Sequence, residues 1–224
     1  MLFSWKDNQS ANFSIFNKNN EDLVKELKYE GITDNNILLA MKKVPRELFV
    51  EQQFIDKAYN NIPLPIDCGQ TTSQPYVIAY MISCLKLINT ENVLEIGTGT
   101  GYQTAILSHL CKYVYTVEIH SKLIGKAKKN IKKLNLKNIA FKLGNGARGW
   151  ESKILFDTII ISAASKITPP KLLENLKNRG RLIMPKKYSL GNQRLLLIKK
   201  NNENYLKEEL LDVKFVPLLN KDAE

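Results

Sequence analysis

The sequence of 224 residues contains few residues that could bind a metal ion or form a disulfide. It has three cysteines and two histidines. No cysteine stands in a CxxC pattern or in a Cys/His spacing that holds zinc, so we expect no metal site. An odd, scattered set of cysteines favours reduced thiols and a cytoplasmic compartment. We expect His109 and His120 to be surface or partly buried residues with no role in chemistry.

Long apolar runs are also missing. No stretch approaches the roughly 20 apolar residues of a membrane-spanning helix, and residues 1–20 lack the apolar run of a signal peptide. We therefore expect no membrane partner. Internal repeats and linkers rich in Pro, Gly or Ser are absent too, which predicts a single domain over residues 21–224 after an arm formed by residues 1–20. The sequence leaves open whether this arm is mobile or packs locally.

Acidic residues are scarce relative to basic ones, because 33 Lys and Arg oppose 22 Asp and Glu and give a net charge of +11. Such an excess favours acidic partners such as nucleic acid. Eight lysines and no acid lie between Ser121 and Lys142. We interpret this stretch as the solvated outer face of a helix. The alternative, an RNA-binding stripe, is weakened because no aromatic residue that could stack on bases lies between Lys126 and Lys137.

The first part of the domain, residues 21–75, combines helices with a long irregular segment. Asn20 is predicted to cap a first helix that ends at Gly31, and Thr33 is predicted to cap a second. The segment 59–75 contains prolines and a glycine that exclude regular structure, and its apolar residues indicate that it is ordered. Ser73 is predicted to cap the apolar helix that follows.

In the remainder, residues 76–224, short apolar runs alternate with helical segments, as in a cofactor-binding α/β core. Strands are predicted at 93–96, 114–117, 139–143, 158–161, 182–184 and 195–198, and helices at 101–112, 121–134 and 169–178. Nearly continuous apolar strands separated by helices indicate a mostly parallel sheet covered on both faces. Apolar and charged residues alternate over 211–215 instead, which predicts an antiparallel edge strand.

The sequence NVLEIGTGTGYQTAIL reads as a strand, a glycine-rich turn and a helix. Gly97, Gly99 and Gly101 permit positive φ and let a ligand approach bare backbone, and the helix directs unpaired N–H groups at that ligand. The next strand ends in Glu118, 17 residues after Gly101. A carboxylate there accepts hydrogen bonds from both hydroxyls of a ribose. We therefore predict a bound nucleoside.

The spacing of the glycines distinguishes between cofactors. A dinucleotide fingerprint is GxGxxG, whereas this sequence has GxGxG and no Walker lysine motif. Glu95 precedes the turn, and an acid there is unfavourable beside a pyrophosphate but suits a cation. These features favour S-adenosyl-L-methionine, whose sulfonium and amino group are positively charged.

Seven stretches resemble the bacterial branch of the protein-L-isoaspartate O-methyltransferase family, in order, from about residue 21 to about residue 219. They are VPRELFV (44–50), AYNNIPLPIDCGQTTSQPY (58–76), VLEIGTGTGYQTAIL (93–107), VYTVE (114–118), FDTIIISAA (156–164), GRLIMP (180–185) and FVPLL (215–219). The block GQTTSQPY is the most specific, because it is similar to this family's own signature. The resemblance implies a Rossmann-like methyltransferase fold, with a seven-stranded, mostly parallel sheet, helices on both faces and a helical N-terminal extension.

The resemblance also implies an activity. Enzymes of this family transfer a methyl group from S-adenosyl-L-methionine to the free α-carboxylate of L-isoaspartyl residues in damaged proteins and peptides, with S-adenosyl-L-homocysteine as the product. The ester then closes to a succinimide, which reopens partly to normal aspartate. The family is expected to be cytosolic and monomeric, and neither a membrane nor a nucleic acid is an expected partner.

The resemblance also assigns site residues, motif by motif. Ser73 matches the serine treated as the active-site residue. Substrate binding is assigned to Thr71, Thr72, Ser73, Ala163 and Ala164. Cofactor binding is assigned to Glu95, Gly97, Thr98, Gly99, Gly101, Tyr102, Gln103, Glu118, Ile119, Asn145 and Gly146. Departures from the family's pattern occur at Asn60, Thr72, Asn145 and Ser165.

The residues around Ser73 suit a carboxylate acceptor. A carboxylate, with a pKa near ~4, is already ionised at neutral pH and needs alignment and exclusion of water but no general base. The segment 70–74 offers hydroxyls and amides and no His, Lys or Cys. We therefore predict that Ser73 positions the acceptor and does not attack. The alternatives are another methyltransferase, such as an RNA methylase, motivated by the positive charge, and a degenerate cofactor-binding module, motivated by the departures.

Overall fold

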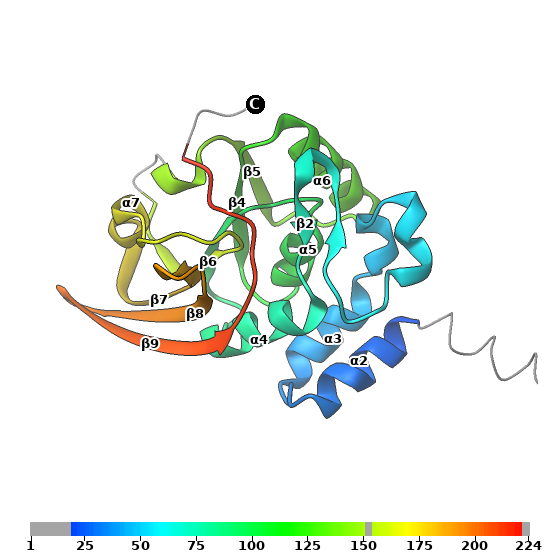
Figure 1. Ribbon diagram of the computed structural model, residues 1–224, viewed down its shortest axis with the longest axis horizontal. Helices are drawn as coiled ribbons and strands as arrows, with labels where there is room; N and C mark the ends of the chain where they lie inside the picture. The colour runs from blue at the N-terminus through cyan, green and yellow to red at the C-terminus, as the bar shows by residue number, and fades with distance from the viewer. Residues whose placement is uncertain (1–18, 151–153, 221–224) are drawn as a thin grey trace, which may run out of the picture.

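The computed structural model describes residues 19–150 and 154–220, which form an α/β structure around a seven-stranded sheet (Figure 1). The strands are β3 (Asn92–Ile96), β4 (Tyr113–Glu118), β5 (Ile139–Leu143), β6 (Phe156–Ile161), β7 (Leu176–Lys187), β8 (Gln193–Asn201) and β9 (Asn204–Asp212). Their order across the sheet is β5-β4-β3-β6-β7-β8-β9. Strands β3 to β7 run parallel, and β8 and β9 continue the sheet in the antiparallel sense. The predicted mostly parallel seven-stranded sheet is confirmed.

Helices cover both faces of this sheet. One face packs against α2 (Asn20–Tyr29), α3 (Asn35–Lys43), α4 (Pro75–Leu85) and α5 (Tyr102–Ser108), and Ile131 of α6 (Ser121–Lys133) joins the same apolar core. The other face packs against α7 (Pro170–Glu174), whose Leu172 enters a second apolar core. In β3, Val93 lies in the first core and Leu94 in the second, because successive strand residues point to opposite faces.

The segment between α3 and α4 contains several short elements, so the prediction that residues 59–75 exclude regular structure is wrong in part. It comprises η1 (Arg46–Phe49), η2 (Gln52–Lys57), β1 (Leu64–Pro65), η3 (Asp67–Gly69) and β2 (Thr71–Thr72). The two short strands pair with each other in the antiparallel sense. This segment runs beside α5 and α6 and carries Ser73 to the carboxyl edge of the sheet (Figure 1).

The caps of the first two helices differ from the predictions by one residue. Asn19 caps α2, so Asn20 is the first helical residue, and its side chain donates instead to carbonyls at the end of α3. Asp34 caps α3, because its carboxylate accepts from two backbone N–H groups of the first turn, and Thr33 lies before the cap. Both caps satisfy helix N–H groups that have no partner within the helix.

The edge strand predicted over residues 211–215 is wrong in its position. β9 ends at Asp212, and the chain beyond it follows Gln193 of β8. The side-chain amide of Gln193 accepts a hydrogen bond from the N–H of Phe215 and donates one to its carbonyl. The side chain of Gln193 therefore pairs with the backbone of Phe215 where a neighbouring strand would otherwise do so. The helix predicted over 169–178 is also shorter, because β7 begins at Leu176.

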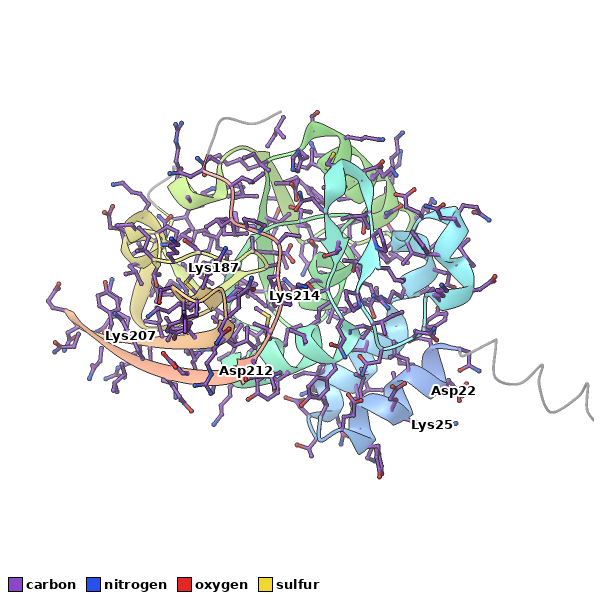
Figure 2. All side chains as sticks on the ribbon, in the orientation of Figure 1. Asp22, Lys25, Lys187, Lys207, Asp212 and Lys214 are labelled. Atoms are coloured by element: carbon purple, nitrogen blue, oxygen red, sulfur yellow. The ribbon has the colours of Figure 1, made fainter. Side chains whose placement is uncertain are left out.

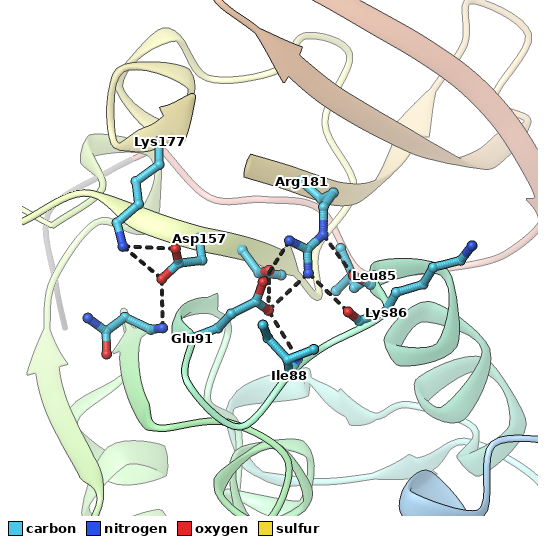
Figure 3. Close-up of polar contacts among 9 residues, drawn as sticks. Leu85, Lys86, Ile88, Glu91, Asp157, Lys177 and Arg181 are labelled. Carbon is cyan, nitrogen blue, oxygen red and sulfur yellow. Dashed lines mark hydrogen bonds and ion pairs between the residues drawn. The ribbon is translucent and has the colours of Figure 1, made fainter. Parts of the chain in front are cut away.

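A polar cluster ties the amino ends of β3 and β6 to β7 (Figure 3). The guanidinium of Arg181 pairs with both carboxylate oxygens of Glu91, at 2.7 and 2.9 Å, and donates to two carbonyls at the end of α4. The carboxylate of Asp157 accepts from Lys177 and from the N–H of Asn92, the first residue of β3. The cluster lies at the end of these strands opposite the glycine turn.

This cluster predicts a specific loss of stability. Glu91→Ala should lower the free energy of unfolding by about 3 kcal/mol, because it leaves a largely buried guanidinium without its carboxylate. Glu174→Ala is the control, since it removes an exposed ion pair with Lys171 and should cost less than about 1 kcal/mol. Urea unfolding followed by circular dichroism measures both variants. Equal losses would contradict the role of the cluster.

Candidate active site

The glycine turn joins the carboxyl end of β3 to α5. Gly97, Gly99 and Gly101 have φ values of 96°, 56° and 96°, a region that side chains rarely adopt. A Cβ on Gly101 would lie 3.3 Å from the Cβ of Ala127 on α6, so this helix approaches the turn closely. The turn therefore presents bare backbone at the edge of the sheet where parallel sheets bind their ligands.

Glu118, the last residue of β4, faces the turn. Its carboxylate accepts hydrogen bonds from the backbone N–H groups of Gly99 at 2.8 Å, Ile119 at 2.9 Å and His120 at 3.1 Å. The side chain is buried but lines a cavity. The predicted ribose-binding carboxylate is therefore fixed in place by the backbone of two strand ends.

An open cavity connects the glycine turn to the segment around Ser73. It measures about 810 Å³, including space open to solvent, and its walls are the turn, the end of β4 and residues 70–73 and 216–219. Ile66 reaches over the turn, with its Cδ1 3.5 Å from the position that a Cβ on Gly99 would take. Ser73 and Ser162 also line a second hollow beside the first. The two spaces thus adjoin at Ser73.

Most of the predicted site residues line this cavity. From the cofactor set these are Gly97, Thr98, Gly99, Tyr102, Gln103, Glu118, Ile119 and Gly146, and from the substrate set Thr71, Thr72, Ser73 and Ala163. The predicted residues outside its lining are Glu95, Gly101, Asn145 and Ala164.

Glu95 is fully buried beneath the turn. Its carboxylate accepts hydrogen bonds from Thr104 at 2.5 Å, Thr116 at 2.7 Å and Gln103 at 2.9 Å. Burial raises the pKa of Glu95 to about 7, and these hydrogen bonds oppose the rise. Gln103 lines the cavity and also donates to the hydroxyl of Ser162. Glu95 therefore meets the cavity through Gln103 and not directly.

Asn145 does not line the cavity, and its side chain bonds to two other parts of the chain. Its side-chain oxygen accepts from the N–H of Ala147 at 2.9 Å, and its amide donates to Asn220 at 2.9 Å. The next residue, Gly146, does line the cavity. A Cβ on Gly146 would lie 2.3 Å from a methyl group of Ile96, so no larger residue fits there without movement.

Ala164 positions residues 216–219, a wall of the cavity that the sequence pattern does not predict. Its N–H donates to the carbonyl of Val216 and its carbonyl accepts from the N–H of Leu218, both at 2.8 Å. These bonds hold residues 216–219 beside the turn. The string FVPLL contributes to the family resemblance, but nothing in its pattern indicates that it closes a site formed by residues far earlier in the chain.

Ser73 does not have the capping role predicted for it. α4 begins at Pro75, its N-cap is Gln74, and no side chain makes a capping bond. A proline at the first helical position has no N–H to satisfy, which removes one need for a cap. Within the described ranges the hydroxyl of Ser73 has no hydrogen-bond partner. It is thus available to a ligand where the two hollows adjoin.

His120 differs from the expectation of a surface or partly buried histidine, because it is buried and lies beside the cavity. It is 8% exposed and lines the cavity. Its Nε2 atom is buried and has no hydrogen-bond partner among the residues that the structure describes. A buried polar atom beside a cavity is expected to find its partner in a ligand or water. In the sequence, its position two residues after Glu118 is the feature that could have indicated a place beside the cavity.

Membrane-spanning helices and metal-binding clusters are both absent from residues 19–150 and 154–220. None of the helices there is both long enough and apolar enough to cross a lipid bilayer. No three His, Cys, Asp or Glu side chains in the same ranges gather as a metal-binding group.

Cys68, Cys84 and Cys111 are free thiols, and burial raises the pKa of Cys111 to about 12.

Sequence comparisons connect the chain to one family. A model of the family described as protein-L-isoaspartate(D-aspartate) O-methyltransferase matches residues 17–223. A protein-L-isoaspartate O-methyltransferase of Parvibaculum lavamentivorans is 44% identical over 200 residues, which cover 88% of this chain and 90% of the relative. One of Dictyoglomus turgidum is 45% identical over 218 residues, covering 96% of each chain.

Solved structures agree with these relatives. One protein-L-isoaspartate O-methyltransferase superposes with a TM-score of 0.83 at 28% identity and covers 90% of this chain and 66% of its own. A second, a putative enzyme of this kind from Plasmodium falciparum, superposes with a TM-score of 0.80 at 26% identity, covering 90% of this chain and 99% of its own. The Plasmodium protein was crystallised in complex with S-adenosyl-L-homocysteine.

The buried Glu95 predicts how stability depends on pH. Its pKa is raised from 4.5 to about 7 in the folded protein, so the folded state binds more protons between these values. The stability that neutral Glu95 provides is complete below about pH 4.5 and is lost as the pH rises through about 7. Glu95→Gln should therefore reduce the decline in the free energy of unfolding across this window, by on the order of 3 kcal/mol.

Urea unfolding at intervals from about pH 4.5 to about pH 8 tests this expectation. Glu174→Gln, at an exposed position, should retain the wild-type profile. A decline in Glu95→Gln as steep as that of the wild type would show that the protonation of Glu95 does not set the profile.

Proposed function

The chain belongs to the protein-L-isoaspartate(D-aspartate) O-methyltransferase family, and from this premise we propose that it initiates the repair of damaged proteins. It transfers a methyl group from S-adenosyl-L-methionine to the free α-carboxylate of L-isoaspartyl residues, and the ester closes to a succinimide that reopens partly to aspartate. The cavity that joins the glycine turn to residues 71–73 carries the proposal, because it brings a nucleoside site beside hydroxyl donors.

The residues on the turn side fit S-adenosyl-L-methionine. Glu118 is assigned to the ribose hydroxyls, because its carboxylate lies in the cavity wall. Bare backbone at Gly97 and Gly99 suits the close approach of the methionine part, and Ile119 and Gly146 are assigned to the adenine. When bound, this cofactor supplies a methyl group on a sulfonium. Asn145, which the resemblance assigns to cofactor binding, is now proposed to place Gly146.

The residues on the acceptor side fit an anion that is already ionised. Thr71, Thr72 and Ser73 supply hydroxyl groups, and Ala163 lies with them in the wall. Among the described residues, the first cavity is lined by no Lys or Arg, and Lys214 lines the second hollow. A carboxylate needs no base, and hydroxyl donors suffice to orient it. Ser73 is thus proposed to position the α-carboxylate and not to form a covalent bond with it.

The partners follow from this chemistry. Isoaspartyl proteins and peptides are the proposed substrates, and the second hollow beside Ser73 offers space for the residues that flank the isoaspartate. The proposal includes a monomer and a cytoplasmic location, with the latter supported by free thiols at all three cysteines.

The distribution of charge does not favour the RNA alternative. On α6, Lys122 and Lys126 form ion pairs with Asp67 of η3, so part of the lysine stretch is paired within the chain. Lys207 of β9 and Lys25 of α2 lie far from each other in the view, on the two sides of the molecule (Figure 2). A nucleic-acid site concentrates such residues on one face.

The proposed activity predicts a selective substrate. The purified chain should transfer tritiated methyl groups from S-adenosyl-L-methionine to an isoaspartyl peptide and leave its aspartyl twin and RNA unlabelled. The label should be released by mild base, because carboxyl methyl esters hydrolyse there. Base-stable label, or label on RNA alone, would exclude carboxyl methylation, and failure to bind S-adenosyl-L-homocysteine in calorimetry would favour a degenerate module.

The role of Ser73 predicts a separation of binding from turnover. Ser73→Ala should lower kcat/KM for the isoaspartyl peptide by about 10-fold to 100-fold, since one orienting hydrogen bond is lost. Binding of S-adenosyl-L-homocysteine should stay within about threefold of wild type. Ser83→Ala is the matched control, because its hydroxyl donates within α4. Turnover by Ser73→Ala equal to that of the control would remove Ser73 from the proposed site.

A further inference from the structure

Arg46 is a fully buried arginine that does not line either hollow of the site. It begins η1 within the string VPRELFV. We propose that Arg46 is a positioning residue for the methyl acceptor: its guanidinium holds the backbone that presents Ser73, and so sets the affinity for the isoaspartyl peptide. This inference rests on the proposed function and adds a residue to it.

The guanidinium gathers four backbone carbonyls from an irregular stretch. One terminal nitrogen donates to Ala58 at 3.0 Å and Asn60 at 2.9 Å, and the other donates to Ile62 at 2.9 Å and Ser73 at 3.2 Å. Carbonyls in irregular chain have no helix or sheet partner, and buried ones need a donor. Arg46 supplies these donors, and the last of them fixes the residue that faces the acceptor.

The chemistry of this contact requires an arginine. None of the ion pairs found among the described residues involves Arg46, so its charge is met by four carbonyl dipoles and by the ring of Tyr102. Burial lowers its pKa to about 10, which is still above neutral pH, so the guanidinium stays protonated there. A planar guanidinium carries five N–H donors in fixed directions, whereas a lysine ammonium is a single point on a flexible stem. A lysine would keep the positive charge but could not donate hydrogen bonds to all four carbonyls at once.

Arg46 also contacts the cofactor side. Its Cζ atom lies 5.5 Å from the ring centroid of Tyr102, the first residue of α5 and part of the cavity wall. The hydroxyl of Thr100 in the glycine turn donates to the carbonyl of Phe49, in the same short helix as Arg46. Together these contacts connect η1, and through Arg46 the carbonyls of residues 58–73, to the glycine turn and to α5.

Other contacts also hold the irregular stretch that contains Ser73, so it does not depend on Arg46 alone. The side chain of Asn61 accepts from the N–H of Tyr76, and Lys122 and Lys126 pair with Asp67. With these contacts intact, loss of Arg46 should leave the loop attached while freeing the carbonyl of Ser73. Peptide affinity should then respond more than cofactor affinity.

Steady-state kinetics of Arg46→Lys and Arg46→Met test the proposal. The KM for the isoaspartyl peptide should rise at least about 10-fold, while the Kd for S-adenosyl-L-homocysteine changes less than about threefold. Ile159→Ala is the stability control, since it truncates a buried residue in the core on the opposite face. Its KM for the peptide should stay at the wild-type value at a temperature where all variants are folded. A wild-type peptide KM in folded Arg46→Lys would overturn the proposal.

A second experiment applies if neither Arg46 variant folds. An ester in place of the peptide bond between Ser73 and Gln74 weakens the Ser73 carbonyl as an acceptor, and the N–H of Gln74 has no partner within the part of the chain described. The peptide KM should rise at least about threefold, and no change would overturn the proposal. An inactive wild-type chain would instead contradict the proposed function, independently of Arg46.

Discussion

Three backbone N–H groups converge on the carboxylate of Glu118, and the part of the cavity beside the glycine turn depends on this contact. Gly99 belongs to the turn after β3, whereas Ile119 and His120 follow β4, so one side chain joins the carboxyl ends of two neighbouring strands. Hydrogen bonds to a charged acceptor are about twice as strong as neutral ones. A carboxylate held in this way keeps its direction before a ligand arrives, and little reorganisation is needed on binding.

A second acid, Glu95, stabilises the same turn from below by a different route. It lies opposite Thr116 in the register of β3 and β4, and the hydroxyl of Thr116 is 2.6 Å from that of Thr98 in the turn. Glu95, Thr116, Thr98 and Thr104 thus form a continuous polar network in an apolar surrounding. Fully satisfied networks of this kind rigidify the backbone around them. Glu118 therefore lines the cavity, whereas Glu95 contacts the neighbouring polar side chains of the protein.

The parallel half of the sheet was predictable because its strands are buried on both faces and read as continuous apolar runs. The glycine turn and Glu118 were also predictable from local sequence. Each stands directly at the end of a predicted strand, where the residue types themselves indicate a ligand site. Arg46 was not predictable from the residues, because its partners are carbonyls as far as 27 positions away, and any residue type supplies a carbonyl. The hydrogen bonds between Ala164 and residues 216 and 218 could not be predicted from the sequence for the same reason. Long-range backbone contacts leave no pattern in the side chains.

The lysines of α6 illustrate this limit, because two of them have acidic partners far earlier in the chain. Lys122 lies 2.6 Å from Asp67, and Lys126 lies 2.6 Å from Glu51 and also pairs with Asp67. The acids are 55 or more positions earlier in the chain, so the lysine-rich stretch reads as uniformly solvated. Isolated surface pairs contribute little, but several charges that share one geometry contribute more. Asp67 is the neighbour of Ile66, which covers the glycine turn, so two of these lysines help to hold the segment that leads to Ser73.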